Sequence, residues 1–218
     1  MSQEKHLSKR EKNKIEKRKA LIDASLDLFL EFGVEVVTID VIVKKAAISK
    51  GSFYNYFDSK PSLISAIFEP YYDTVKTSFA KTKEEFKHVK NDEDLFELYK
   101  GLAMALALTF LANPKVTLLF IQNNKGPATP SKKVFMDLYE LVISECYEIT
   151  VIARKYELFG NDIDPAVSTL TVVGAVETLL SRFFGNHFQP EKGLEIIDDL
   201  IELILNGLKP TFIKANDS

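Results

Sequence analysis

The sequence predicts an all-α protein of about nine helices, on the basis of three observations. Gly and Pro are sparse, at 9 and 8 of 218 residues. Apolar residues recur at spacings of three and four along most of the chain, the period of a helix with one buried face. Strict alternation of apolar and polar residues, typical of a half-buried strand, is scarce. The predicted helices cover residues 12–32, 39–46, 50–56, 59–79, 95–111, 114–122, 132–156, 166–184 and 191–208.

The ends of the first four helices are indicated by residues with special backbone or capping roles. Gly33 follows the first helix, where a residue that tolerates positive φ is favoured. The hydroxyls of Thr38 and Ser49 can cap the second and third helices. Pro61 lies in the first turn of the fourth helix, where its missing N–H costs least.

Loops separate the later helices. Asn91 is a candidate cap before the fifth helix, and Asn113-Pro114 interrupts the pattern after it. The segment 124–131 contains Gly126, Pro127 and Pro130 and is the clearest loop in the chain.

Composition restricts the class of protein. Hydrophobic residues make up 46% and charged residues 27%, as in a protein with a sizeable core. The longest apolar run, residues 102–112, is interrupted by Thr109 and looks too short to cross a bilayer. The hydrophilic stretch up to Lys19 has no secretory pattern, and the single cysteine, Cys146, forms no intramolecular disulfide and fits a reducing compartment. We therefore expect a cytoplasmic protein that does not bind a membrane.

Catalytic and metal-binding patterns are missing from the sequence. The three histidines lie far apart in the sequence. The sequence shows no nucleophile with a nearby base, no Gly-rich phosphate loop and no pair of carboxylates in a context that would indicate a catalytic site. We expect neither an enzyme, nor a metal site, nor a cofactor.

Charge is distributed unevenly along the chain. Residues 1–60 hold 12 Lys and Arg against 9 Asp and Glu, whereas residues 61–218 hold 16 against 22. A basic N-terminal part on an acidic body suits a partner that is a polyanion, although a solvated tail would show the same charge.

Residues 38–57 predict a helix-turn-helix, since two short helices are joined by a turn of three to four residues. Apolar residues in this stretch can hold the pair against the first helix. The remaining side of the second short helix carries Lys50, Ser52, Tyr54, Asn55 and Tyr56.

These groups suit DNA. Lys50 and Lys60 supply positive charge for phosphates, and tyrosine and serine hydroxyls add neutral donors. Ser52 or Asn55 can reach base edges in the major groove, and Lys50 can pair either with guanine acceptors or with phosphate.

The stretch from about Arg18 to Ala66 resembles the TetR-type transcriptional regulators. The resemblance is carried by Leu28-Phe29, Phe32-Gly33, Thr38 and the string from Ile48 to Leu63, which reads ISKGSFYNYFDSKPSL. Val43 stands where the family usually has a small Ala, and Ala47 where it usually has Gly. If this turn needs positive φ, Ala47 costs roughly 1 kcal/mol relative to Gly.

The resemblance implies a homodimer with an operator-binding domain at residues 1–60 and a helical domain at 61–218 that binds an effector and dimerises. Carried over by position, the phosphate contacts are Thr38, Lys50, the Gly51 backbone, Tyr54, Tyr56 and Lys60. Ser52 and Asn55 become the expected readers of base edges. Tyr54 and Tyr56 have the alternative of packing within the protein.

The last two helices carry more apolar surface than one interior needs, which indicates a helical dimer interface. The helix at 191–208 has a second stripe, with Leu203, beside its first, and Leu170 accompanies the stripe of the preceding helix. The expected interface residues are Val173, Val176, Leu180, Ile197, Leu200, Ile201 and Ile204.

Aromatic and soft residues on the central helices are candidates for an apolar effector pocket, although plain core packing would produce the same pattern. The candidates are Phe68, Tyr72, Met104, Phe110, Phe120, Tyr139, Cys146 and Phe183. Cys146 also fits a small buried hydrophobe better than a redox sensor. Glu177 and Arg182 form either a pair that faces a ligand or a salt bridge.

Together these features predict a ligand-responsive repressor that binds a palindromic operator as a dimer and is released by a small, largely apolar effector. Two other classes remain open. A DNA-compacting protein would bind all sequences alike, and a helical small-molecule carrier would not bind DNA.

Overall fold

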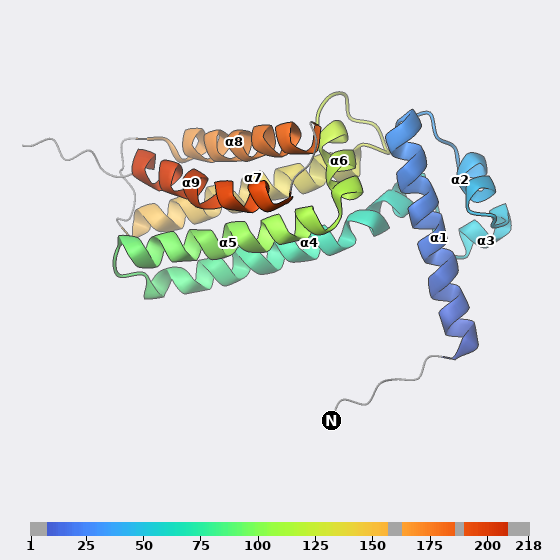
Figure 1. Ribbon diagram of the computed structural model, residues 1–218, viewed down its shortest axis with the longest axis horizontal. Helices are drawn as coiled ribbons and strands as arrows, with labels where there is room; N and C mark the ends of the chain where they lie inside the picture. The colour runs from blue at the N-terminus through green and yellow to red at the C-terminus, as the bar shows by residue number, and fades with distance from the viewer. Residues whose placement is uncertain (1–7, 157–162, 186–189, 209–218) are drawn as a thin grey trace, which may run out of the picture. The chain divides into compact units, whose positions relative to one another are not determined.

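The computed structural model describes residues 8–156, 163–185 and 190–208, and within these ranges it contains nine α-helices (Figure 1). A 3₁₀ turn, η1 (Phe86–His88), follows α4 and was not predicted. The all-helical prediction is confirmed, and most helix ends lie within three residues of the expected positions. The helices are α1 (Lys9–Phe32), α2 (Ile39–Lys45), α3 (Lys50–Tyr54), α4 (Lys60–Glu85), α5 (Asp92–Ala112), α6 (Pro114–Asn123), α7 (Lys133–Lys155), α8 (Pro165–Gly185) and α9 (Pro190–Leu208).

The chain folds into two compact units. The N-terminal unit extends to Glu69 and includes Gln122–Met136, and the C-terminal unit contains Pro70–Ile121 and the chain from Asp137 onward. The boundary falls inside α4 at Pro70, which has no N–H for a helical hydrogen bond. The predicted functional division after residue 60 stays a prediction.

Side-chain caps begin the helices of the N-terminal unit. Ser8 and Glu11 form a capping box at α1, and the Gly33 backbone, at φ 86°, ends that helix. Thr38 and Ser49 cap α2 and α3 as predicted. Each cap satisfies backbone N–H groups that have no partner inside the helix.

The core of the N-terminal unit is built on phenylalanine rings. Phe29 of α1 and Phe53 of α3 are almost fully buried, and the Phe53 ring lies 5.7 Å from that of Phe57. Phe68 of α4 packs edge-on against Phe135 of α7, with ring centroids 5.0 Å apart. The segment Gln122–Met136 therefore contributes to the core of the N-terminal unit.

In the C-terminal unit, α9 packs against both α5 and α8. An ion pair between Lys100 of α5 and Asp198 of α9, 2.8 Å apart, adds a polar contact at the edge of the first pair. The buried core lies on several helices and contains Val75, Phe79, Phe86, Leu95, Leu102, Leu119, Phe120, Leu138, Ile149, Ala153, Val173, Ile201 and Leu205.

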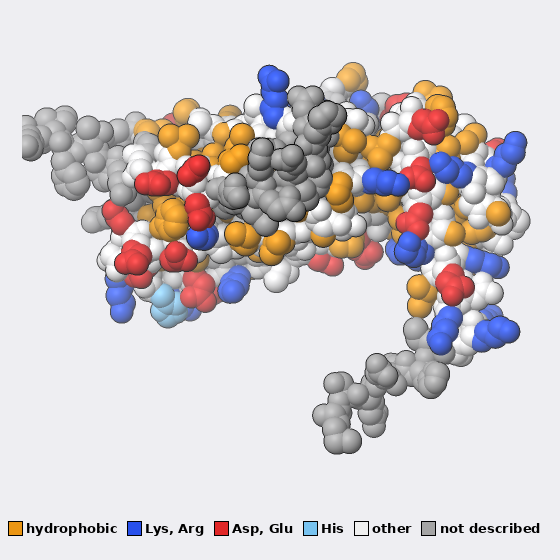
Figure 2. Space-filling view, in the orientation of Figure 1, with side chains coloured by type: hydrophobic (Ala, Val, Ile, Leu, Met, Phe, Trp, Pro, Cys, Tyr) orange, Lys and Arg blue, Asp and Glu red, His pale blue; other side chains and the backbone are white. Residues whose placement is uncertain are grey.

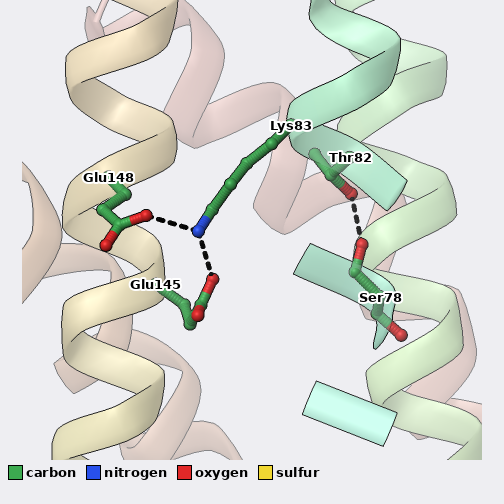
Figure 3. A network of polar contacts seen from close by, with 5 residues as sticks. All are labelled: Ser78, Thr82, Lys83, Glu145 and Glu148. Carbon is green, nitrogen blue, oxygen red and sulfur yellow. Dashed lines mark hydrogen bonds and ion pairs between the residues drawn. The ribbon is translucent and has the colours of Figure 1, made fainter. Parts of the chain in front are cut away.

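A polar network joins α4 to α7 in the C-terminal unit (Figure 3). The Lys83 ammonium lies 2.7 Å from the Glu145 carboxylate and also pairs with Glu148. Burial alone would lower the pKa of Lys83, but its two carboxylate partners outweigh burial and raise that pKa. Thr82 adds a local hydrogen bond to the Ser78 carbonyl, so it does not join the ion pairs.

By length and composition, α5 could cross a membrane, with a mean hydropathy of 1.5 over its most apolar window. The helix as a whole is longer than the apolar run at residues 102–112 on which the expectation rested. Its contacts with α9 and the ion pair at Lys100 are those of a helix packed within a helical protein.

Candidate nucleic-acid interface

The turn between α2 and α3 has a left-handed residue at its centre. Ala47 has φ 53°, its N–H donates to the Lys44 carbonyl, and the Ile48 N–H donates to the Val43 carbonyl at 3.0 Å. These two bonds define a Schellman motif, in which a residue with positive φ ends the helix. Val43 is buried and Ile48 half-buried, as expected for the apolar pair that accompanies this motif. The turn thus needs positive φ and places an alanine there.

Helix α3 buries one side and exposes the other. Phe53 is fully buried, whereas Lys50, Gly51, Tyr54 and Asn55 are exposed. Tyr54 is 49% accessible to solvent. Its ring packs edge-on against the ring of Phe53. The polar side predicted to meet DNA is therefore not covered by the described part of the protein.

Two predicted contact residues, Thr38 and Ser52, take part in helix caps, and Tyr56 is half-buried. The Thr38 Oγ1 accepts the Val41 N–H at 3.4 Å. The Ser49 hydroxyl accepts the Ser52 N–H at 3.1 Å and donates to the Ser52 Oγ at 2.9 Å. The Ser52 hydroxyl thus keeps its own proton for an outside acceptor. Tyr56 exposes only part of its surface and lies near the Phe57 ring, at 6.5 Å between centroids.

Lys50 is held by a carboxylate that the sequence analysis did not select. Its ammonium lies 2.8 Å from Oδ1 and 3.1 Å from Oδ2 of Asp40, in the first turn of α2. The hydrogen bond to Asp40 raises the pKa of Lys50, so the side chain is charged at neutral pH. The position of an acidic residue two places after the Thr38 cap was the only sequence feature that could have indicated Asp40.

Lys60 has a partner that is part of the protein itself. Its ammonium donates to the carbonyls of Val34, Glu35 and Val37 at 2.7, 3.3 and 3.0 Å, and so holds the α1–α2 connection. Burial lowers the pKa of Lys60, and the nearby Glu35 opposes this shift. The predicted phosphate contact of Lys60 would require this ammonium to leave three backbone acceptors.

The α1–α2 connection also binds the loop that follows α6. The Thr129 hydroxyl donates to the Glu35 carboxylate at 2.6 Å, within the N-terminal unit. Glu35 and Thr129 are separated by more than 90 residues, so no sequence spacing could indicate this contact.

Basic and acidic side chains are interleaved over α1–α3, as the face drawn in Figure 2 shows. The ion pairs of Lys45 with Asp27, at 3.6 Å, and Lys50 with Asp40 belong to this pattern. The interface is therefore not a uniform basic surface, and specific groups have to supply the contacts.

The candidate pocket residues are distributed over both units. Phe68 belongs to the N-terminal core, whereas Phe110 and Phe120 approach each other in the C-terminal unit, at 6.2 Å between ring centroids. The Tyr139 hydroxyl donates to the Glu177 carboxylate at 3.1 Å, which gives Glu177 a partner other than the expected Arg182.

Met104, Cys146 and Tyr72 are half-buried, and the Phe183 side chain lies outside the described residues. Burial raises the pKa of Tyr72 to about 12.

The candidate interface residues on α8 and α9 differ in exposure. Val173 and Ile201 are buried within the unit, Leu180, Leu200 and Ile204 are half-buried, and Val176 is exposed. The Ile197 side chain lies outside the described residues. The largest exposed apolar side chains on these helices are Val167, Leu170 and Leu203, at 57%, 56% and 71%.

Across the described parts of the chain, no group of three or more His, Cys, Asp or Glu residues is placed to hold a metal ion.

Comparison with known proteins identifies the family of the chain. Residues 21–67 match the family model described as bacterial regulatory proteins, tetR family. The chain is 33% identical over 198 residues to YhgD of Bacillus subtilis (strain 168), an uncharacterized HTH-type transcriptional regulator. The match covers 89% of this chain and 97% of YhgD.

Two solved structures share the fold. The fatty acid degradation regulator FadR of Bacillus halodurans superposes with a TM-score of 0.67 at 15% identity, over 88% of this chain and 99% of that one. The regulator FadR of Bacillus subtilis, in complex with stearoyl-CoA, gives a TM-score of 0.64 at 13% identity, over 87% and 98%.

Proposed function

Because the chain belongs to the TetR family of bacterial regulatory proteins, we propose that it is a repressor that binds a palindromic DNA operator as a homodimer. A small, largely apolar effector releases it. Family membership makes the protein a DNA-binding transcriptional regulator and not an enzyme. Its place of action is the cytoplasm, where the operator lies.

The observation that carries the proposal is the open polar side of α3. A buried Phe53 anchors this helix, and Tyr54 and Asn55 on its outer side are exposed. Ser52 and Asn55 read base edges in the major groove, and Thr38, Gly51, Tyr54 and Tyr56 contact phosphates. Lys50 reaches the duplex from the start of the same helix.

The exposed apolar side chains of α8 and α9 support the proposed dimer. Val167, Leu170 and Leu203 are each more than half exposed. Large apolar side chains gathered on a surface mark an interaction site, and a two-fold axis lets the same surface serve both partners. Such a dimer presents two copies of α3 to half-sites about 34 Å apart.

The proposed effector is a molecule with an extended apolar part. A related fold in Bacillus subtilis is described in complex with stearoyl-CoA, so a long-chain acyl-CoA is the first class to test. Phe110, Phe120 and Met104 offer apolar surface in the C-terminal unit, and the Tyr139–Glu177 pair offers polar groups. The effector acts only if it binds the conformation with low DNA affinity better than the other.

Helix α4 is the element that can transmit this change, since it runs through both compact units. Pro70 removes one helical hydrogen bond at the boundary and weakens the helix there. A shift of α4 then changes the separation of the two α3 helices in the dimer.

The test is selection of bound duplexes from a random DNA pool with the purified protein. A palindromic consensus supports the proposal, whereas indifference to sequence supports a compacting protein, and no binding at low salt supports a carrier. Tyr54→Ala should weaken binding to the selected operator and leave the dimer intact. Loss of the dimer in that variant would contradict the division of roles between α3 and the C-terminal helices.

A further inference from the structure

A single ion pair bridges the two helices of the helix-turn-helix on its exposed surface. Both carboxylate oxygens of Asp40 lie within 3.1 Å of the Lys50 ammonium, with side-chain exposures of 68% and 54%. Asp40 lies in the first turn of α2, and Lys50 is the first residue of α3. A carboxylate thus holds the cation at the start of the helix that carries the DNA-contacting side chains.

This pair contributes little to folding. Exposed ion pairs gain little in water, because solvent screens the charges and both side chains lose rotational freedom. The two helices are already joined by the Schellman turn at Ala47 and by buried Phe53. The pair's main effect is therefore on the charge and position of the Lys50 ammonium.

Near a duplex, Asp40 opposes attraction that does not depend on sequence. If Lys50 stays with Asp40, the pair brings no net charge to the phosphates. If Lys50 moves to a phosphate, an unpaired carboxylate is left on the same surface and repels the backbone. Both cases reduce the counterion release from which non-specific affinity arises.

We propose that Asp40 is a specificity-determining residue that restrains Lys50 and thereby weakens binding to arbitrary DNA more than binding to the operator. The inference rests on the proposed DNA-binding function. In the operator complex, contacts from Ser52, Tyr54 and Asn55 favour one placement of α3, and Asp40 keeps the Lys50 ammonium aimed for that placement.

Asp40→Asn is the informative change, because it removes the negative charge and keeps an oxygen that can accept a hydrogen bond. An added uncompensated cation steepens the dependence of log affinity on log salt by about 0.9. The increase in affinity for a random duplex, relative to the wild type, should therefore shrink about threefold between roughly 50 and 200 mM salt. The ratio of operator affinity to random-duplex affinity should fall several-fold.

Glu84→Gln is the matched control. Glu84 pairs with Lys87 at 3.1 Å, with side-chain exposures of 78% and 55%, and lies in the C-terminal unit. Glu84→Gln changes the net charge by the same amount as Asp40→Asn. If overall charge alone set the DNA affinity, both variants would therefore show the same change in affinity. The Glu84→Gln protein should keep the wild-type ratio and salt slope.

The experiment measures affinities of the full-length proteins for the selected operator and for a random duplex of equal length, across salt. The change that Asp40→Asn makes in the ratio of operator affinity to random-duplex affinity should vanish in a Lys50→Gln background, because without the ammonium the Asp40 carboxylate repels both duplexes alike. In the Lys50 protein, equal gains on both duplexes or no change would overturn the inference, as would a change in the ratio that persists in the Lys50→Gln background. Asp40→Ser gives the same test should Asp40→Asn fail to fold. A wild-type protein without operator preference would instead refute the proposed function, and the inference with it.

Discussion

Ala47 shows how one residue can carry strain inside a common helix-ending turn. It occupies the left-handed position of the Schellman turn, where an L-residue with a Cβ is disfavoured. The sequence alone raised this possibility, and the φ of 53° confirms it. The hydrogen bonds on both sides of Ala47 fix this conformation.

We expect Ala47→Gly to stabilise the protein by about 1 kcal/mol, since Gly adopts this conformation without steric cost. Thermal unfolding should then occur about 2–4 °C higher. The adjacent Ala46, with φ −75°, is the matched control, and Ala46→Gly should lower stability. An unchanged or lower Tm for Ala47→Gly would show that the turn is not strained.

Cys146 allows a pH prediction at the same scale. Burial raises the pKa of its thiol to about 12, above the value of 9.0 for an unperturbed cysteine. The folded protein therefore holds this proton more tightly than the unfolded chain does. The resulting stability is present below pH 9 and is lost as pH rises towards 12.

The corresponding measurement is the rate of thiol modification by a disulfide reagent at pH 8. Native protein should react slower than urea-unfolded protein by a factor on the order of 10³, because the thiolate is the reactive form. Equal rates would contradict the burial of Cys146.

The helices themselves were largely predictable, because their ends depend on neighbouring residues. Asn91 caps α5 through its side chain as expected, and Asn113-Pro114 separates α5 from α6. The 3₁₀ turn at Phe86–His88 was not predicted, since nothing local distinguishes it from a continued helix. Helical periodicity therefore gave the elements and not the finer turns between them.

Side-chain contacts between different helices and loops could not be predicted from the sequence. The three carbonyls bound by Lys60 lie 23 to 26 residues away, and the partner of Lys50 lies 10 residues away across a turn. Periodicity identifies the side of a helix that is buried or exposed. It does not identify the atom to which an exposed cation is bound.

The role of Lys60 in holding the α1–α2 connection can be tested by substitution. In Lys60→Met the aliphatic part of the side chain stays, and the α1–α2 connection loses three charge-assisted hydrogen bonds. Stability should fall by about 1–2 kcal/mol. Operator affinity should also fall, because the Thr38 end of α2 is no longer held.

The salt dependence distinguishes this positioning role from a phosphate contact. If Lys60 only positions the connection, the slope of log operator affinity against log salt should match that of the wild type. A slope lower by about 0.9 would instead indicate a lost phosphate contact and contradict the positioning role.

For the whole molecule, the proposed dimer depends on the exposed apolar surface of α8 and α9. Leu170 and Leu203 are more than half exposed, so replacing them removes little buried surface within the described chain. The double variant Leu170→Glu/Leu203→Glu should be monomeric in light scattering at micromolar concentration, with the helical circular dichroism of the wild type. Exposed Leu108 of α5, 54% accessible, provides the control, and Leu108→Glu should stay dimeric. A double variant that remains a dimer would place the interface elsewhere.

The central claim is that the open side of α3 enters the major groove of a symmetric operator. Dimethyl sulfate interference tests it most directly, because the reagent methylates guanine N7 in the major groove and adenine N3 in the minor groove. The account predicts interference at guanine N7 positions in two symmetric half-sites about 34 Å apart, weakened in Asn55→Ala. Interference at adenine N3 alone, or at a single unpaired half-site, would contradict it.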